Sequence, residues 1–212
     1  MSTEPPPHPI SLTVADDLRR SRVTVFFRLL IAIPHLVWWY LWNIVALVVA
    51  ILAWVCTLVI GRPPRPFHRF LGAFIRYQTH VWAFVTLVGN PFPGFVGARG
   101  SYPVDLVTPV EPERQNRLGV FFRIVLALPA LVLDRVLSYV LLVVAIFAWF
   151  AALVRGRMPD GFRDLGAYVL RYTGQAHGYV FLQTARYPHS SPRSEFATAA
   201  DGVTSPAPTP AP

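Results

Sequence analysis

The sequence predicts an all-α membrane protein built from two tandem repeats. Two long apolar stretches, 23–60 and 118–154, carry this prediction, because each is too apolar to be a surface helix of a soluble domain. Composition agrees: 54% of the 212 residues are hydrophobic and 14% are charged, against about 25% charged in soluble domains. The net charge of +8 comes from arginine alone. Arginines at the ends of apolar stretches indicate anionic headgroups as partners and argue against nucleic acid.

The second half of the chain repeats the first. When the sequence is shifted by 95 positions, residues 22–93 and 117–188 are identical at 28 of 72 positions. Such a match predicts two similar structural units. We place the units at 10–94 and 103–188, with a linker at 95–102, and expect the two ends of the chain, 1–9 and 189–212, to be disordered.

Each unit has the same order of parts. A short alternating stretch predicts a brief strand, and a polar segment with arginines predicts a helix start. The long apolar block and a Gly/Pro/Arg loop follow. A third segment predicts an amphipathic helix that lies in the membrane interface or against the apolar block. The strands are expected at 9–14 and 103–107, the helix starts at 16–22 and 111–117, and the amphipathic helices at 67–88 and 162–183.

The long blocks do not fit a single straight crossing, because 38 helical residues span about 57 Å and the bilayer core about 30 Å. Asp134-Arg135 lies in the middle of the second block, where a charged pair at mid-bilayer is costly. The aligned segment 38–43 is rich in Trp and Tyr, as at a membrane interface. These features predict a helical hairpin in each unit, with legs at 23–39 and 43–60, and at 118–133 and 138–154.

A kinked long helix is the alternative. The first leg then lies in the interface and bends at Pro34 or Pro129. The second leg, at about 41–60 or 136–154, crosses once, and the amphipathic segment crosses back.

The hairpin places all arginine-rich flanks on one side, which the positive-inside rule makes cytoplasmic. We therefore expect a multi-pass protein of the inner (cytoplasmic) membrane with both termini in the cytosol and no secretory signal. The two units are expected to be parallel, related by a pseudo-twofold axis along the membrane normal. Small-residue stripes of the second legs are expected to face each other: Ala46, Ala50, Ala53 and Thr57 in one unit, and Ala145, Ala148 and Ala152 in the other.

Repeated arginines and tyrosines are the candidate lipid- or anion-binding residues. Each has a structural alternative. Arg28 and Arg123 could contact lipid phosphates or only extend along apolar surface to the headgroups. The repeated Arg-Tyr pairs could hold a phosphate through a bidentate guanidinium or tie a helix to a loop. The six candidates are Arg28, Arg123, Arg76, Arg171, Tyr77 and Tyr172.

No catalytic or metal-binding motif stands out. The single cysteine, Cys56, excludes an intramolecular disulfide, and the six histidines form no HxxxH or HExxH pair. No GxSxG, P-loop or dinucleotide motif occurs. We expect no enzyme activity, no metal and no cofactor.

Several motifs together resemble the bacterial domain-of-unknown-function family 4389. They are Ala32-Ile33-Pro34-His35, Ala53-Trp54, Gly61-Arg62-x-Pro64-Arg65 and Arg186-Tyr187-Pro188. The second unit departs from the pattern at Ala127-Leu128-Pro129-Ala130, and Asn90 and Ala185 replace the family's closing aspartate. The resemblance implies a membrane protein of a mostly actinobacterial group and implies no particular activity.

Two functions remain open. The absence of repeated intramembrane acids favours a non-catalytic scaffold, or a subunit that binds lipid or a membrane protein partner. The duplication, the prolines inside the apolar blocks and the repeated arginines favour a small transporter or channel built from two parallel repeats.

Overall fold

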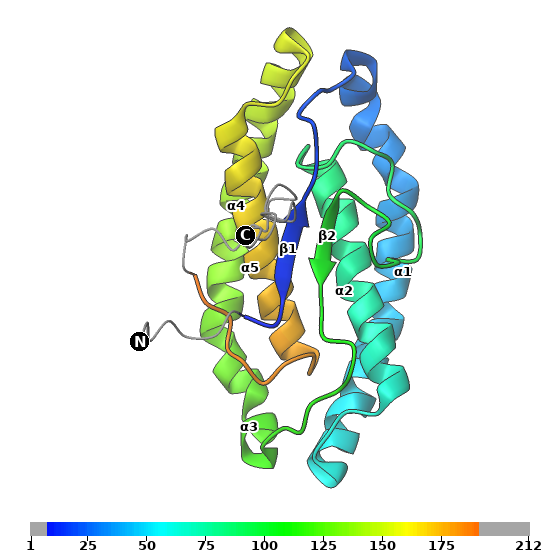
Figure 1. Ribbon diagram of the computed structural model, residues 1–212, viewed down its shortest axis with the longest axis vertical. Coiled ribbons are helices and arrows are strands. Elements are labelled where there is room, and N and C mark those ends of the chain that lie inside the picture. The colour runs from blue at the N-terminus through cyan, green and yellow to red at the C-terminus, as the bar shows by residue number, and fades with distance from the viewer. Residues whose placement is uncertain (1–7, 191–212) are drawn as a thin grey trace, which may run out of the picture.

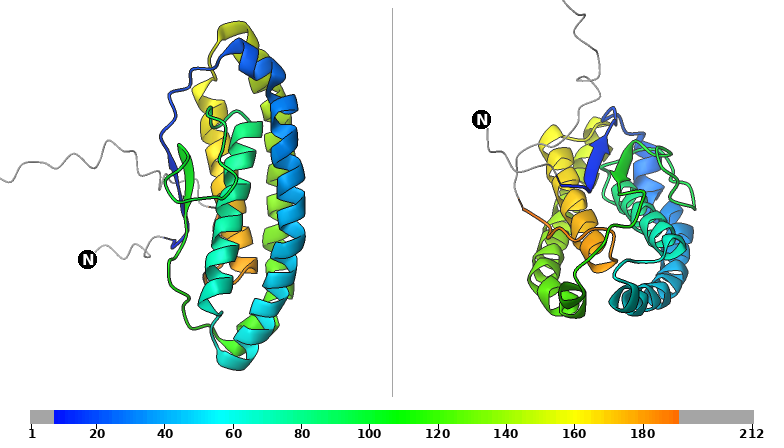
Figure 2. Two further views of the ribbon diagram at one scale, coloured as in Figure 1. Left: turned by 90° about the vertical axis from the view of Figure 1, so that its right-hand side faces the viewer. Right: turned by 60° about the horizontal axis from the view of Figure 1, so that its bottom comes forward.

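The computed structural model describes residues 8–190, which form three layers (Figures 1 and 2). Long helices make one outer layer, two shorter helices the middle, and two strands the other outer layer. In chain order the elements are β1 (Ser11–Val14), α1 (Arg22–Ile60), α2 (Arg65–Val85), β2 (Val104–Val107), α3 (Arg117–Phe121), α4 (Arg123–Arg155) and α5 (Asp160–Val180). The segments 1–7 and 191–212, for which disorder was predicted, lie outside the described residues.

The predicted hairpin inside each apolar block is wrong. α1 is one helix of 39 residues, about 58 Å long, and continues through Pro34. In the second unit α3 and α4 together cover the aligned residues, with an interruption only at Phe122, and α4 continues through Pro129. Both long helices end at a left-handed glycine, Gly61 and Gly156.

Two features of the chain explain why the helix does not turn back. The segment 40–43 holds no Gly or Pro that could reverse the chain. Asp134 is buried instead of lying at a membrane surface, and its Oδ1 accepts a hydrogen bond from Thr173 Oγ1 of α5 (2.6 Å). The polar middle of α4 therefore marks a contact with a neighbouring helix, and no break is required there.

The amphipathic helices form the middle layer. α2 and α5 pack against the long helix of their own unit and against each other. Their N-terminal prolines, Pro64 and Pro159, suit a helix start. Most residues of both helices are buried, including polar ones such as Gln78, Thr79 and Gln175.

The strands form the third layer, over α2 and α5 (Figure 2). β1 and β2 confirm both predicted strands and pair antiparallel, Ser11 opposite Val107 and Val14 opposite Val104. Asp105 of β2 ties the sheet to α2, because His80 Nε2 donates to its carboxylate (2.8 Å) and Gly100 N–H donates as well (2.6 Å). Burial alone raises the pKa of Asp105, but these hydrogen bonds outweigh it and the net pKa is lowered.

The two units are antiparallel, so the prediction of parallel repeats is wrong. Trp149 Nε1 of α4 donates to Val25 O near the start of α1 (2.8 Å), and Trp54 Nε1 of α1 donates to Val120 O of α3 (2.8 Å). The start of each long helix therefore meets the end of the other. The pseudo-twofold axis runs across the long helices, through all three layers (Figure 1).

The small-residue stripes do not face each other either. Ala46 and Ala53 pack in a cluster with Leu71 and Phe74 of α2, and Ala148 packs in a different cluster. Small residues on each long helix instead let other elements approach closely.

Apolar side chains are exposed along the whole outer side of α1 and α4, here called the apolar face. On α1 they run from Val23 (68% exposed) through Val48 (53%) to Ile60 (55%), and on α4 from Ile124 (64%) to Val154 (73%). Both helices are long and apolar enough to cross a membrane.

Arginines lie at both ends of the molecule, which corrects the prediction that they share one side. The antiparallel arrangement divides them between the two ends. Arg19, Arg22, Arg155, Arg157 and Arg163 lie near one end, and Arg62, Arg65, Arg69, Arg114 and Arg117 near the other.

Candidate functional site

Arg28 and Arg123 bind the ends of the middle helices. Arg28 Nη2 donates to the carbonyls of Gly89 and Asn90, just after α2, and its guanidinium lies 4.3 Å from the Phe84 ring centroid. Arg123 donates to Tyr179 O (3.0 Å) and to the carbonyl after α5 at Thr184 (3.3 Å). Both side chains are buried. The expectation that they extend to lipid headgroups is therefore wrong, because they satisfy carbonyl groups at helix C-termini.

The Arg-Tyr pairs of α2 and α5 also bond to the protein. Arg76 donates to Gly97 O (3.0 Å) and to Thr108 Oγ1 (2.7 Å). Tyr77 and Tyr172 donate to carbonyls of the long helices, His35 O (3.2 Å) and Ala130 O (3.4 Å).

Arg171 is buried, with its guanidinium carbon 5.6 Å from the Tyr168 ring centroid. Lipid or anion binding by these repeated residues stays a prediction, and none of them lines the cavity between the two units.

A central cavity of about 440 Å³ lies between the two units and is lined by residues of α1, α2, α4 and α5. Residues of α2 and α5 form its floor, and its mouth opens between α1 and α4 on the apolar face. Exposed side chains at the rim include Tyr139 (63%) and Leu142 (51%).

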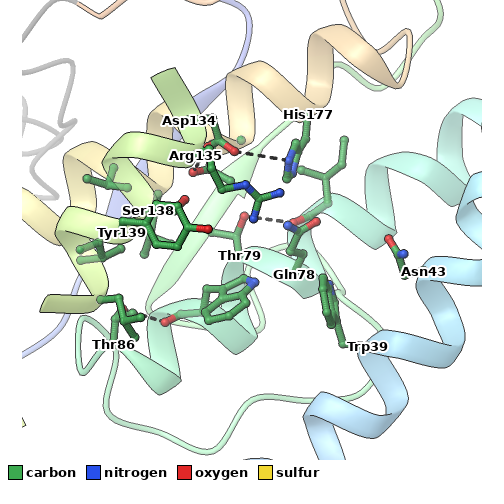
Figure 3. Close-up of a pocket in the computed structure, with 18 of the residues that line it drawn as sticks. Trp39, Asn43, Gln78, Thr79, Thr86, Asp134, Arg135, Ser138, Tyr139 and His177 are labelled. Atoms are coloured by element: carbon green, nitrogen blue, oxygen red, sulfur yellow. Dashed lines mark hydrogen bonds and ion pairs between the residues drawn. The ribbon is translucent and has the colours of Figure 1, made fainter. Parts of the chain in front are cut away.

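One wall of the cavity is charged and comes from the second unit. Figure 3 shows Asp134, Arg135 and His177 close together, with Arg135 directed toward Gln78 and Thr79 of the first unit. His177 Nε2 lies 3.8 Å from Asp134 Oδ2. Burial lowers the pKa of His177 despite this carboxylate, so the imidazole is uncharged at neutral pH.

The opposite wall is aromatic and comes from the first unit. Trp39 and Trp82 line it, with ring centroids 6.1 Å apart in an edge-to-face arrangement. Two polar atoms of the walls, Trp39 Nε1 and His177 Nδ1, are buried without a hydrogen-bond partner among residues 8–190.

The two walls occupy equivalent positions of the repeat. With the shift of 95, Trp39 aligns with Asp134 and Trp82 aligns with His177. The helix-capping arginines and the Arg-Tyr pairs are identical in the two units, whereas these cavity positions are not. The repeated arginines and tyrosines thus make contacts within the fold, whereas the cavity is lined at positions 39, 82, 134 and 177 by residues that differ between the two units.

Sequence reasoning missed the cavity, although Asp134-Arg135 was its signal. We interpreted that pair as a break at a membrane surface, because a single sequence does not show which helix faces it. No group of three or more His, Cys, Asp or Glu side chains that could hold a metal ion gathers within residues 8–190.

Comparison with known protein families identifies the family of the chain. The family model described as "Domain of unknown function (DUF4389)" matches twice, at residues 22–96 and 117–191. The chain belongs to the DUF4389 family. The first DUF4389 copy begins at the start of α1 and the second at the start of α3; each includes the middle helix that follows, and a strand precedes each copy. No curated protein and no solved structure matches the chain.

Proposed function

We propose that the protein is a non-catalytic, membrane-bound scaffold or lipid-binding subunit, and that it lies flat on the cytoplasmic side of the inner membrane. In this orientation α1 and α4 lie along the bilayer with the apolar face in lipid. The observation that carries the proposal is the continuous exposure of large apolar side chains along both long helices, from Val23 to Ile60 and from Ile124 to Val154. A face of this size in water promotes association or binding.

Length favours the flat orientation over a crossing. The apolar face of α1 extends for about 55 Å, and a bilayer core is about 30 Å thick. The strands give a second argument. They run alongside the middle of the molecule (Figure 1), so a crossing would put a two-stranded sheet with open edges at hydrocarbon depth, where its backbone groups would lack partners.

The charges agree with the flat orientation as well. Arginines at both ends give no bias for one side, whereas a flat molecule places both ends at the headgroups of one leaflet. The two ends of the described chain lie together, since the His8 and His189 rings are 5.5 Å apart. Both termini then face the cytosol.

Cysteine labelling tests the orientation. In a Cys56→Ala background, we place single cysteines at Arg62 and Arg157, which lie at opposite ends of the molecule. A membrane-impermeant maleimide should label neither position in spheroplasts and both in inverted vesicles. Labelling of one position from each side would contradict the flat orientation. Ser101→Cys, exposed near the strands, is the matched control for the aqueous face.

The central cavity, at the contact between the units, favours a transporter as the second candidate. Transport requires an opening on both sides of the molecule. The floor residues Gln78 and Thr79 are buried beneath the strand layer. Purified protein in liposomes should therefore show no anion flux. If the unaltered protein does conduct anions, and the Arg76→Ala/Arg171→Ala double variant loses this flux while remaining equally stable, the transporter is favoured. A stoichiometric partner in a native-membrane purification would favour the scaffold.

A further inference from the structure

We propose that the central cavity binds one membrane lipid whose headgroup carries a phosphate and an ammonium group. The ammonium lies between Asp134 and the indole rings of Trp39 and Trp82, and the phosphate lies at Arg135. This inference deepens the proposed function and rests on it in one respect: the mouth of the cavity must face lipid.

The carboxylate of Asp134 indicates a cationic group in the ligand. Asp134 is 6% exposed and receives one neutral hydrogen bond, from Thr173 Oγ1. His177, whose imidazole is uncharged, lies 3.8 Å away and does not form a full ion pair with it. A cation in the cavity would pair with this buried carboxylate.

The aromatic wall indicates that this cation is an ammonium. Trp39 and Trp82 line the side of the cavity that faces the charged wall, and indole is the best aromatic partner for a cation. A carboxylate on one side and indole rings on the other are the two groups that recognise ammonium and its methylated forms.

Arg135 indicates an anionic group next to the ammonium. Its guanidinium is directed toward Gln78 and Thr79 in Figure 3, and the polar side chains of Ser138 and Asn43 also line the cavity. Guanidinium binds phosphate oxygens in a bidentate manner. Adjacent residues of opposite charge thus match a headgroup in which phosphate and ammonium are neighbours.

The place of the mouth indicates a lipid over a free metabolite. The cavity opens between α1 and α4 onto the apolar face, and its rim residues Tyr139 and Leu142 are exposed. Acyl chains attached to a headgroup in the cavity would continue along exposed apolar side chains.

The test is calorimetric titration of the full-length protein in a neutral detergent with dihexanoyl lipids. Dihexanoyl-phosphatidylethanolamine should bind with one site per chain and about tenfold more tightly than dihexanoyl-phosphatidylglycerol, which has the phosphate and chains but no ammonium. Asp134→Asn keeps the acceptor for Thr173 and should abolish this preference. Arg135→Gln should weaken both lipids. Asp160→Asn, an exposed acid at the start of α5, is the matched control and should change neither.

Equal affinity for the two lipids, or a preference that survives in folded Asp134→Asn, overturns the inference. O-phosphoethanolamine alone distinguishes the source: binding as tight as that of the lipid would make the ligand a free metabolite and overturn the lipid assignment. Circular dichroism of each variant establishes that it is folded. If Asp134→Asn does not fold, Trp39→Phe is the second variant, and it should reduce the preference for the ethanolamine lipid.

Failure here is distinguishable from failure of the proposed function. Titration with lipid monomers does not require vesicle binding, whereas flotation with phosphatidylglycerol vesicles does not require the cavity. Protein that floats but shows no ethanolamine preference retains the membrane proposal and loses this one. Protein that shows the preference but neither floats nor labels as expected retains the headgroup site and loses the flat orientation.

Discussion

Replacing Gly97 by alanine should destabilise the protein far more than replacing Gly100, although both glycines have a left-handed backbone. Gly97 has φ +56° and Gly100 has φ +66°. A Cβ at Gly97 would lie 2.3 Å from Ala73 O and 2.7 Å from Tyr77 N, both backbone atoms of α2. A Cβ at Gly100 would meet no heavy atom within 4 Å. The pair therefore separates backbone strain from steric contact.

The magnitudes follow from these contacts. Alanine in a left-handed conformation costs about 1–2 kcal/mol, which is the whole effect expected for Gly100→Ala. Gly97→Ala adds the close contact with α2, about 1–3 kcal/mol. It also adds the loss of the hydrogen bond from Arg76 to Gly97 O as the loop lifts, about 1.5–3 kcal/mol. The total is about 3.5–8 kcal/mol.

Thermal unfolding in a neutral detergent, followed by circular dichroism, is the assay. At about 2–4 °C for each kcal/mol in a chain of this size, Gly100→Ala should lower Tm by a few degrees and Gly97→Ala by about 7 °C or more. Equal shifts would refute the close packing of the 89–103 loop on α2, and with it the structural role assigned to Arg76.

Two further predictions concern stability. Arg28→Met and Arg123→Met each remove a buried guanidinium from carbonyls at the end of a middle helix and should cost about 2–4 kcal/mol, measured as unfolding in detergent. Arg22 donates an exposed hydrogen bond to Val154 O, so Arg22→Met should cost at most about 1 kcal/mol. If all three variants lose the same stability, the capping role of Arg28 and Arg123 is contradicted. The lowered pKa of Asp105 means that its bonds with His80 and Gly100 stabilise the fold above the unfolded-state pKa of about 3.9 and are lost as pH falls below it. Asp105→Asn should therefore flatten the Tm-against-pH curve in that acid range, and an unchanged curve would show that another group controls it.

Local sequence patterns predicted the parts of each unit. The repeat of the arginines, the Gly-Arg ends of the apolar blocks and the amphipathic third segment all correspond to elements of the structure. The alternation of apolar and polar residues at 9–14 and 103–107 was sufficient to predict the two strands, since β1 and β2 lie within these stretches. Such features depend on neighbouring residues alone.

Contacts between the units could not be predicted in this way. The antiparallel arrangement depends on Trp54 and Trp149 reaching the other unit's helix start, and the sequence shows only that both are tryptophan. The hairpin was wrong because a crossing was assumed, and a crossing requires a 39-residue helix to break. We therefore interpreted Asp134 as lying at a membrane surface. Its partner, Thr173, lies 39 positions away in the sequence, and a single sequence does not show that the two side chains meet.

Depth measured along α1 tests the flat orientation most directly. Phe26, Ile44 and Val55 are exposed on one side of the helix, within about 20° of one another at 100° per residue, and the first and last lie about 44 Å apart. Spin labels at these positions in reconstituted protein report depth through their relative accessibility to oxygen and to a polar relaxation agent. The flat orientation predicts one shallow depth for all three. A profile that starts at one surface, reaches the bilayer centre near Ile44 and returns to the opposite surface would contradict it.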